Sequence, residues 1–223
     1  MHVGFILDGN GRWAASKSLP RSIGHKKGAE NVEAILKTCK NLGIATVTLY
    51  AFSTENWSRP VFEVKALMKL FHYYLKKKLT MLYQENVKVV IIGDVSPFPK
   101  VIKGYIKNLE ELTKNNDGMV LNLAMNYGGR AEIVRATKGI AKDFSDGIIK
   151  TEDFDEKLFS KYLYTDGQKD PDLIIRTAGE KRLSNFLLWQ SAYSELYFVE
   201  KSWPDFSQSD LLDALNYFKS RKR

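Results

Sequence analysis

Residues 2–13 bring together the side chains that most clearly suggest chemistry in this chain. They read HVGFILDGNGRW, an apolar stretch that runs directly into the carboxylate of Asp8. Gly9 and Gly11 let backbone N–H groups approach an anion, and Arg12 adds a cation with a forked set of donors. Asp8 can hold a divalent metal that bridges to phosphate oxygens. The segment therefore predicts a site for a metal and a diphosphate.

The composition limits the class of protein without identifying it. The chain has 223 residues, of which 44% are hydrophobic and 27% charged, as in soluble globular domains. Lys and Arg outnumber Asp and Glu by 34 to 26, an excess that suits nucleic acid, an anionic membrane surface or a phosphorylated substrate. The single Cys39 excludes internal disulfides and a cysteine zinc cluster. Without a signal peptide or an apolar run of roughly 18 residues, we expect a cytoplasmic protein, at most peripheral to the inner face of the membrane.

Strand and helix patterns alternate along the chain. Apolar, β-rich segments predict strands at 3–7, 45–52, 87–92, 119–124, 173–175 and 196–199. Helical periodicity predicts helices at 25–42, 61–84, 99–113, 130–144, 155–163, 185–191 and 208–221. This alternation is typical of βαβ units. We therefore expect one α/β domain over residues 1–223, with a mainly parallel sheet of about six strands covered by helices on both faces.

The unusual polar segments follow the predicted strand ends. Four of them each contribute one arginine: Arg12, Arg59, Arg130 and Arg176. Ligands of open parallel sheets bind beyond the carboxyl ends of the strands. A single loop arginine is most often a solvated surface residue, but four guanidinium groups gathered at one rim need anions to balance them. The pattern therefore favours a site for phosphates over a set of unrelated surface charges.

Glycines after a strand are also typical of dinucleotide-binding proteins, and Gly9-x-Gly11-x-x-Ala14 fits that fingerprint. The fingerprint requires an acidic residue about 20 positions later, at the end of the second strand. The second predicted strand ends without an acid, and Glu55 lies well past that spacing. Asp8 would also repel a pyrophosphate if no metal lay between them. We therefore exclude a nicotinamide site.

Six motifs lie in order within residues 2–206: DGNGRWA, the pair Arg21-x-x-x-His25, FSTENWSRP, NYGGR, IIRTAGEKRLSNFLLWQSAYSELYF and WPDF. Together they resemble the cis-prenyltransferases. The resemblance implies a homodimeric, magnesium-dependent enzyme that condenses isopentenyl diphosphate repeatedly onto farnesyl diphosphate, with a new cis double bond at each step. The expected product is a long-chain polyprenyl diphosphate, di-trans,poly-cis-undecaprenyl diphosphate, which is the precursor of the lipid carrier for cell-wall synthesis.

The resemblance also implies roles for individual residues. The metal residues would be Asp8 and Glu195, and the catalytic residues Asp8, Asn56 and His25. The allylic diphosphate would be held by Gly9, Asn10, Gly11, Arg12, Trp13, Arg21 and His25. A mobile catalytic loop would consist of Ser53, Thr54, Glu55, Asn56, Trp57 and Arg59. Isopentenyl diphosphate would be held by Arg176, Arg182, Leu183 and Ser184. Lys181 departs from the pattern, because some members carry a histidine there and a protonated lysine cannot ligate a metal.

The group that accepts the proton during condensation is left open. The carboxamide of Asn56 has no useful basicity, so we interpret it as an orienting residue. His25, with a reference pKa of about 6.5, and the released pyrophosphate are both candidate bases. His2 and His72 do not lie in strand-end loops, and we interpret them as structural or incidental.

The position of Glu195 conflicts with its implied role. This residue begins the last predicted strand, so a parallel sheet places it at the edge opposite Asp8. Either the direction of that strand is misread, or Glu195 serves the site of a second subunit. We favour the second interpretation.

The apolar product needs a channel. The helices predicted at 25–42 and 61–84 have broad apolar faces, and the small residues Ala29 and Ala51 lie where bulk would obstruct a channel. Most of these residues are ordinary core, but we expect the two helices and the sheet to wall a tunnel. The basic runs 76–78 and 221–223 are most often solvated charge, and a weaker hypothesis is that they attract anionic lipid.

Two other classes of protein compete with this interpretation. A non-catalytic binding partner with the same fold would lack the metal carboxylate motif, which is intact here. A nucleic-acid-binding protein would present a contiguous basic face with exposed aromatics. The arginines here accompany glycines at loop positions instead, so we expect diphosphate substrates and no nucleic acid.

Overall fold

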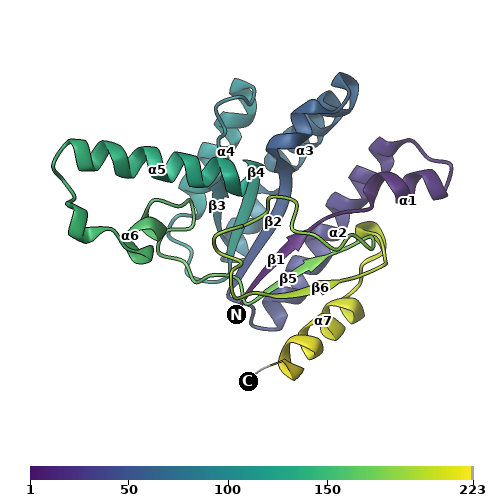
Figure 1. Ribbon diagram of the computed structural model, residues 1–223. Coiled ribbons are helices and arrows are strands. Elements are labelled where there is room, and N and C mark those ends of the chain that lie inside the picture. Colours follow the sequence, from purple (N-terminus) through teal and green to yellow (C-terminus); the bar gives the residue numbers. More distant parts are fainter. Residues whose placement is uncertain (222–223) are drawn as a thin grey trace.

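The computed structural model describes residues 1–221, apart from the side chains of residues 78–80. Its centre is a parallel sheet with the strand order β3-β4-β2-β1-β5-β6 (Figure 1). The strands are β1 (His2–Ile6), β2 (Thr46–Ser53), β3 (Lys88–Ile92), β4 (Val120–Tyr127), β5 (Leu173–Arg176) and β6 (Glu195–Phe198). Every neighbouring pair is parallel, which confirms the predicted α/β architecture with six strands.

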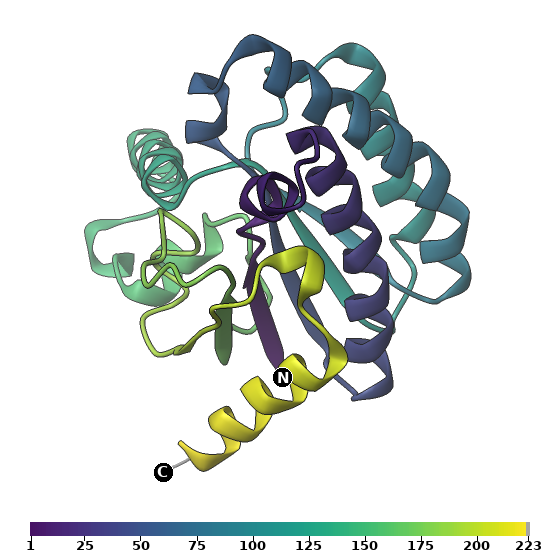
Figure 2. The same cartoon turned by 90° about the vertical axis from the view of Figure 1, so that its right-hand side faces the viewer.

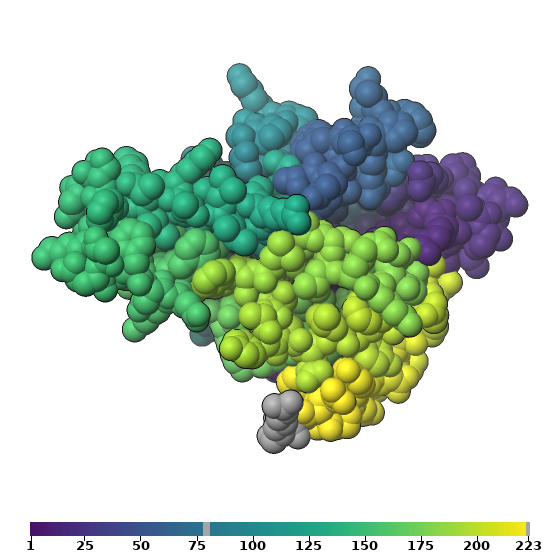
Figure 3. Space-filling model, viewed as in Figure 1, coloured from purple at the N-terminus to yellow at the C-terminus, as the bar shows by residue number. Residues whose placement is uncertain are grey.

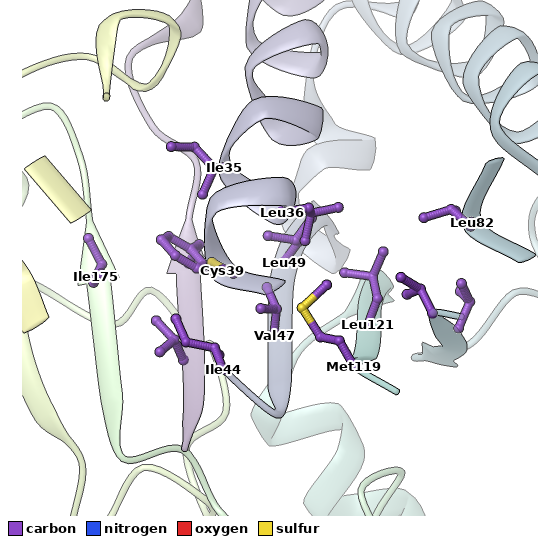
Figure 4. Close-up of a cluster of buried hydrophobic side chains, with 14 of the residues drawn as sticks. Ile35, Leu36, Cys39, Ile44, Val47, Leu49, Leu82, Met119, Leu121 and Ile175 are labelled. Atoms are coloured by element: carbon purple, nitrogen blue, oxygen red, sulfur yellow. The ribbon is translucent and has the colours of Figure 1, made fainter. Parts of the chain in front are cut away.

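One face of the sheet is covered by four long helices (Figure 2). They are α2 (Arg21–Asn41), α3 (Val61–Gln84), α4 (Lys100–Thr113) and α7 (Gln208–Ser220). Side chains of α2, including Ile35, Leu36 and Cys39, pack onto Val47 and Leu49 of β2 (Figure 4). Because the central strands are buried on both faces, both faces carry apolar side chains: Val3 and Phe5 of β1 pack on the side of these helices, and Ile6 packs on the other side.

The other face is covered mainly by the segment 177–194 (Figure 3), with α5 (Gly129–Ser145) and α6 (Glu156–Lys161) beyond it. The prediction of a helix at 185–191 is wrong, because this stretch consists of turns and bends. Ser184, Asn185 and Leu187 have left-handed backbones, with φ of 48°, 68° and 44°, which an α-helix cannot contain. The apolar spacing arises because Phe186 and Leu187 are buried against the sheet.

Two segments expected as loops contain short helices. Residues after Gly9 form α1 (Asn10–Ser16), and the predicted catalytic loop contains the 3₁₀ helix η1 (Thr54–Ser58). Gly9 has a φ of 101° at the start of α1, a backbone conformation that favours glycine. Helix α2 also begins four residues earlier than expected, directly after Pro20. A further 3₁₀ turn, η2 (Thr151–Asp153), precedes α6, and η3 (Trp203–Asp205) precedes α7.

The predicted lipid-facing lysines are only partly described. Lys76 and Lys77 are exposed on α3. The side chain of Lys78 and the residues Lys222 and Arg223 lie outside the described part of the chain. The same holds for the side chain of Leu79, which belongs to the helix predicted at 61–84. Within the described part, no helix has both the length and the apolar character needed to cross a bilayer.

His2 belongs to a buried polar network at the amino edge of the sheet. Its Nδ1 lies 2.7 Å from the carbonyl oxygen of Lys169, which can only accept, so Nδ1 carries the proton. Its Nε2 therefore accepts from the hydroxyl of Thr48, also at 2.7 Å, and Thr48 Oγ1 accepts from Asn122. Burial lowers the pKa of His2, so the neutral imidazole is the folded form. This arrangement supports the structural role predicted for His2.

The lowered pKa of His2 predicts a loss of stability in mild acid. Above pH 6.5 the imidazole is neutral in both the folded and the unfolded chain; below it the unfolded chain binds the proton first, so folding weakens as pH falls. The contribution is at most about 1.4 kcal/mol per pH unit. Urea unfolding at pH 7.5 and 5.5 should show a smaller pH dependence for His2→Gln than for the unmodified chain. An equal dependence would contradict the assignment.

Candidate active site

The carboxyl ends of β1, β2, β4 and β5 meet around one cavity of about 670 Å³. The strand register explains this convergence, since Ile6 pairs with both Tyr50 and Arg176, and Ser53 pairs with Tyr127. The predicted site residues that line the cavity are Asp8, Asn10, His25, Ser53, Glu55, Asn56, Arg59, Arg176 and Ser184. Arg130 also lines it, so three of the four strand-end arginines meet there.

A second, polar cavity of about 400 Å³ adjoins the first. The two share Asp8, Asn10, His25, Arg59 and Arg176, and the second adds Gly9, Gly11, Arg12, Arg21 and Arg182. All four arginines predicted from the strand ends therefore lie around this pair of cavities. The two cavities offer adjacent positions for anionic groups.

The pair formed by Arg176 and Asp8 lies where the cavities meet. Arg176 is only 3% exposed, and its Nη2 and Nε donate to Asp8 Oδ2 at 2.6 and 2.9 Å. Its Nη1 donates to Ser184 Oγ at 2.8 Å and to the carbonyl oxygen of Arg182. Because an unpaired buried guanidinium is strongly destabilising, Asp8 serves as its counter-ion.

A second carboxylate, Glu63, gathers the cations on the other side of the site. It is 5% exposed at the start of α3, and its oxygens accept from Arg59 at 2.9 Å and from Arg21 at 3.2 Å. His25 Nε2 lies 3.8 Å from the same carboxylate. The sequence interpretation missed Glu63, although its position four residues after Arg59 at a helix start is a detectable signal. A third carboxylate, Glu180, lies 3.0 Å from Arg12 and 2.5 Å from Arg182.

His25 is held in its neutral form. Burial lowers its pKa below 6.5, and the nearby cation of Arg59 lowers it further against the opposing effect of Glu63. A neutral imidazole has a free lone pair and can accept a proton.

The predicted catalytic segment at 53–59 is ordered by its own side chains and by two strands. Asn56 Oδ1 accepts from the backbone N–H of Ser53 at 3.1 Å in a reciprocal cap of η1. Trp57 Nε1 donates to Asn126 Oδ1 at 2.8 Å, and its ring packs on Phe52 and Phe98. The register between β2 and β4 shifts at residues 50–53, directly before this segment. Such β-bulges are common next to active sites.

An apolar cavity of about 160 Å³ continues from the central one. Its walls come from α2, α3, the sheet and Leu109 of α4. Ala29 and Ala51 line both cavities, at their junction. This is the arrangement expected of a tunnel between the two helices and the sheet.

Comparison with known proteins identifies the family. Residues 6–223 match the sequence model of the family described as "Putative undecaprenyl diphosphate synthase". The chain belongs to this family. It is 52% identical to an isoprenyl transferase of Prochlorococcus marinus, of which it covers 82%, and 50% identical to one of Bacillus subtilis, of which it covers 85%. It is also 47% identical to the ditrans,polycis-undecaprenyl-diphosphate synthase ((2E,6E)-farnesyl-diphosphate specific) of Buchnera aphidicola, covering 89%. Each alignment takes in the whole of this chain.

Solved structures of related enzymes have the same fold. The chain superposes on lavandulyl diphosphate synthase of Lavandula x intermedia, in complex with dimethylallyl diphosphate, with a TM-score of 0.96 and 40% identity. For a probable undecaprenyl diphosphate synthase of Campylobacter jejuni the TM-score is 0.82 and the identity 32%. Both alignments cover all of this chain and 96% of the solved one.

Some residues expected from the family pattern lie outside both polar cavities. They are Trp13, Thr54, Trp57, Leu183 and Glu195. Trp13 Nε1 donates to Asp205 at 2.8 Å, and Leu183 packs against the buried cluster that contains Phe186 and Leu187. Trp13, Trp57 and Leu183 therefore support neighbouring segments in this structure.

Glu195 lies at the opposite edge of the sheet from Asp8. It pairs with Leu173 at the amino end of β5, and β6 is parallel to β5, so its direction was not misread. Its carboxylate lies 3.6 Å from Arg221. The alternative of a misread strand direction is therefore wrong, and the favoured alternative, that Glu195 serves a second subunit, stays a prediction.

The donor set at Asp8 fits one general mode by which proteins bind magnesium. Among the described residues, no group of three or more His, Cys, Asp or Glu side chains could enclose a metal ion. Mg²⁺ is commonly held by one or two carboxylates together with substrate phosphates and water. Asp8, 37% exposed beside the arginines, fits that mode and not an all-protein cage.

The Asp8–Arg176 pair predicts that removing the carboxylate strengthens metal-free anion binding. In Asp8→Asn the amide oxygen can still accept from Arg176, but the negative charge that competes with a diphosphate is gone. Calorimetric titration with inorganic pyrophosphate in EDTA should show roughly tenfold tighter binding, about 1.4 kcal/mol. Asp117→Asn, exposed just before the amino end of β4, should bind as the unmodified chain does. Unchanged or weaker binding by Asp8→Asn would contradict the competition.

Proposed function

We propose that this protein condenses isopentenyl diphosphate repeatedly onto farnesyl diphosphate, with a cis double bond at each step, to give a long-chain polyprenyl diphosphate. The observation that carries the proposal is the junction at Ala29 and Ala51, where an arginine-lined polar cavity opens into an apolar one. This arrangement places two adjacent positions for diphosphates beside the start of an apolar channel. The Buchnera relative, named for farnesyl diphosphate, supports the same primer here.

The polar cavities support separate positions for the two substrates. Arg176, Arg182 and Ser184 would hold isopentenyl diphosphate, and Arg12 and Arg21 with the start of α1 would hold the allylic diphosphate. Negative charge develops on the allylic pyrophosphate as its C–O bond breaks. Fixed guanidinium groups placed around that position stabilise the developing charge without reorganising.

The proton released on condensation needs an acceptor near the reacting carbons. The side-chain oxygen of Asn56 already accepts a hydrogen bond from the backbone N–H of Ser53, which supports an orienting role for this residue. Neutral His25 and the departing pyrophosphate are the two candidate acceptors of this proton.

Magnesium dependence belongs to the same proposal. Asp8 would hold Mg²⁺ against the diphosphate of a substrate, where the ion neutralises charge on the leaving group. Lys181 is exposed and, while protonated, cannot supply a ligand. This leaves Asp8 as the residue of its own chain that fits the metal.

The proposed reaction is tested by incubating the protein with farnesyl diphosphate, labelled isopentenyl diphosphate and Mg²⁺, followed by chromatography. Long polyprenyl products are expected. Ala51→Leu should shorten them, because Ala51 lines the entrance to the apolar cavity, whereas Ala45→Leu at the exposed amino edge should not. A protein that makes no elongated product, or only short products from dimethylallyl diphosphate, would contradict the proposal.

We further propose a homodimer in which Glu195 serves the site of the partner subunit. Large exposed apolar side chains near β6 and around the α5–α6 region support an interface, among them Ile148 at 69%, Phe154 at 50% and Tyr193 at 100% exposure. The position of Glu195, remote from its own Asp8, supports a shared site.

Mixed subunits test the shared site. Asp8→Ala and Glu195→Ala proteins, each inactive alone, should regain part of the activity when unfolded together and refolded, because one of the two sites in a mixed dimer is intact. A mixture that stays inactive while forming dimers would place Glu195 outside the partner's site.

Contact with the inner face of the membrane completes the proposal. The net charge of +8 and the exposed Lys76 and Lys77 support attraction to anionic lipid. The fraction of protein that sediments with vesicles containing phosphatidylglycerol should fall as the salt concentration rises. Binding that does not change with salt would contradict the electrostatic basis.

A further inference from the structure

Helix α5 begins without a cap of its own. Its N-cap residue is Gly128, which has no side chain to satisfy the first backbone N–H groups. Asn185, from the distant segment that covers the sheet, supplies both partners: its backbone oxygen accepts from Gly129 at 2.7 Å, and its Oδ1 accepts from Arg130 at 2.8 Å. The cap therefore joins α5 to the segment that follows β5.

The same side chain reaches the catalytic segment. Asn185 Nδ2 donates to Glu55 Oε1 at 2.8 Å. Desolvation acts to raise the pKa of Glu55, but the hydrogen bond from Asn185 is the first of several that together lower it. The carboxylate is therefore ionised at neutral pH. Because Oδ1 faces the N–H of Arg130, the orientation of the amide is fixed, with its donor directed at Glu55.

Gly128 allows the close contact between the end of β4, η1 and the segment that contains Asn185. A Cβ at that position would lie 2.7 Å from both Asn185 Nδ2 and Thr54 Oγ1. The glycine therefore lets β4, η1 and the segment after β5 approach each other closely.

Asn185 is also joined to the diphosphate pocket through its neighbour. Ser184 accepts from Arg176 at 2.8 Å, and both Ser184 and Asn185 have left-handed backbones. Asn185 itself lines the central cavity. Ser184, which Arg176 contacts, is therefore directly followed in the chain by the amide that holds Glu55.

We propose that Asn185 is a positioning residue that couples the pocket of Arg176 and Ser184 to the catalytic segment at 53–59. It contacts neither diphosphate in this account and acts by holding Glu55, and with it Asn56, in place. This inference rests on the proposed function for its kinetic effect, but the coupling itself has a structural readout.

Variants that exchange the donor and acceptor roles of Asn185 and Glu55 test the coupling. Asn185→Asp keeps an oxygen to cap α5 but cannot donate to Glu55, so kcat should fall at least tenfold while the KM values change less than threefold. Combining Asn185→Asp with Glu55→Gln reverses donor and acceptor at the same total charge. This double variant should regain at least threefold in kcat over Asn185→Asp alone.

Hydrogen exchange read by mass spectrometry gives a measure that needs no activity. Amides of residues 53–59 should exchange faster in Asn185→Asp and return toward the original rate in the double variant. Asn116→Asp removes an amide donor to the carbonyl of Val87 at the other edge of the sheet, and should change neither kcat nor this exchange.

Two results would overturn the proposal. One is a double variant with exchange at 53–59 no slower than in Asn185→Asp; the other is an Asn185→Asp protein whose exchange and kcat match the original. If the original protein forms no polyprenyl product, the proposed function fails, and the exchange data still decide whether Asn185 holds the segment.

Discussion

The ion pair between the buried Arg176 and Asp8 is the interaction on which the site depends. Arg176 is almost fully enclosed at the end of β5, and a buried guanidinium requires both a counter-ion and partners for its remaining donors. Asp8 at the end of β1 supplies the charge, and residues 182 and 184 supply the other acceptors. The pair therefore joins two neighbouring strand ends and folds the following segment around itself.

The same principle extends to the whole basic site. Glu63 pairs with Arg21 and Arg59, and Glu180 pairs with Arg12 and Arg182. Internal carboxylates thus balance these arginines of a site that we expect to receive diphosphates. In the proposed reaction, binding a diphosphate would exchange one set of anionic partners for another, and a magnesium ion would offer Asp8 a new partner when Arg176 turns to the substrate.

The sequence predicted the location and charge of the site better than its internal contacts. Convergence of the strand-end arginines followed from the parallel sheet, and so did the placement of Glu195 at the opposite edge. Glu63 was missed because it falls within a long amphipathic helix, where the polar contacts of a first turn are set by what lies across the cleft. The turns at 185–191 were mistaken for a helix because burial against the sheet spaces apolar residues much as a helix does.

The central claim is that Asp8 leaves Arg176 for a metal when the substrates bind. A crystal structure with Mg²⁺, isopentenyl diphosphate and an unreactive thio analogue of farnesyl diphosphate tests it directly. We expect diphosphate oxygens about 3 Å from the guanidinium of Arg176 and the carboxylate of Asp8 turned to the metal. A complex in which both diphosphates are bound while Arg176 keeps both of its hydrogen bonds to Asp8 would contradict the account.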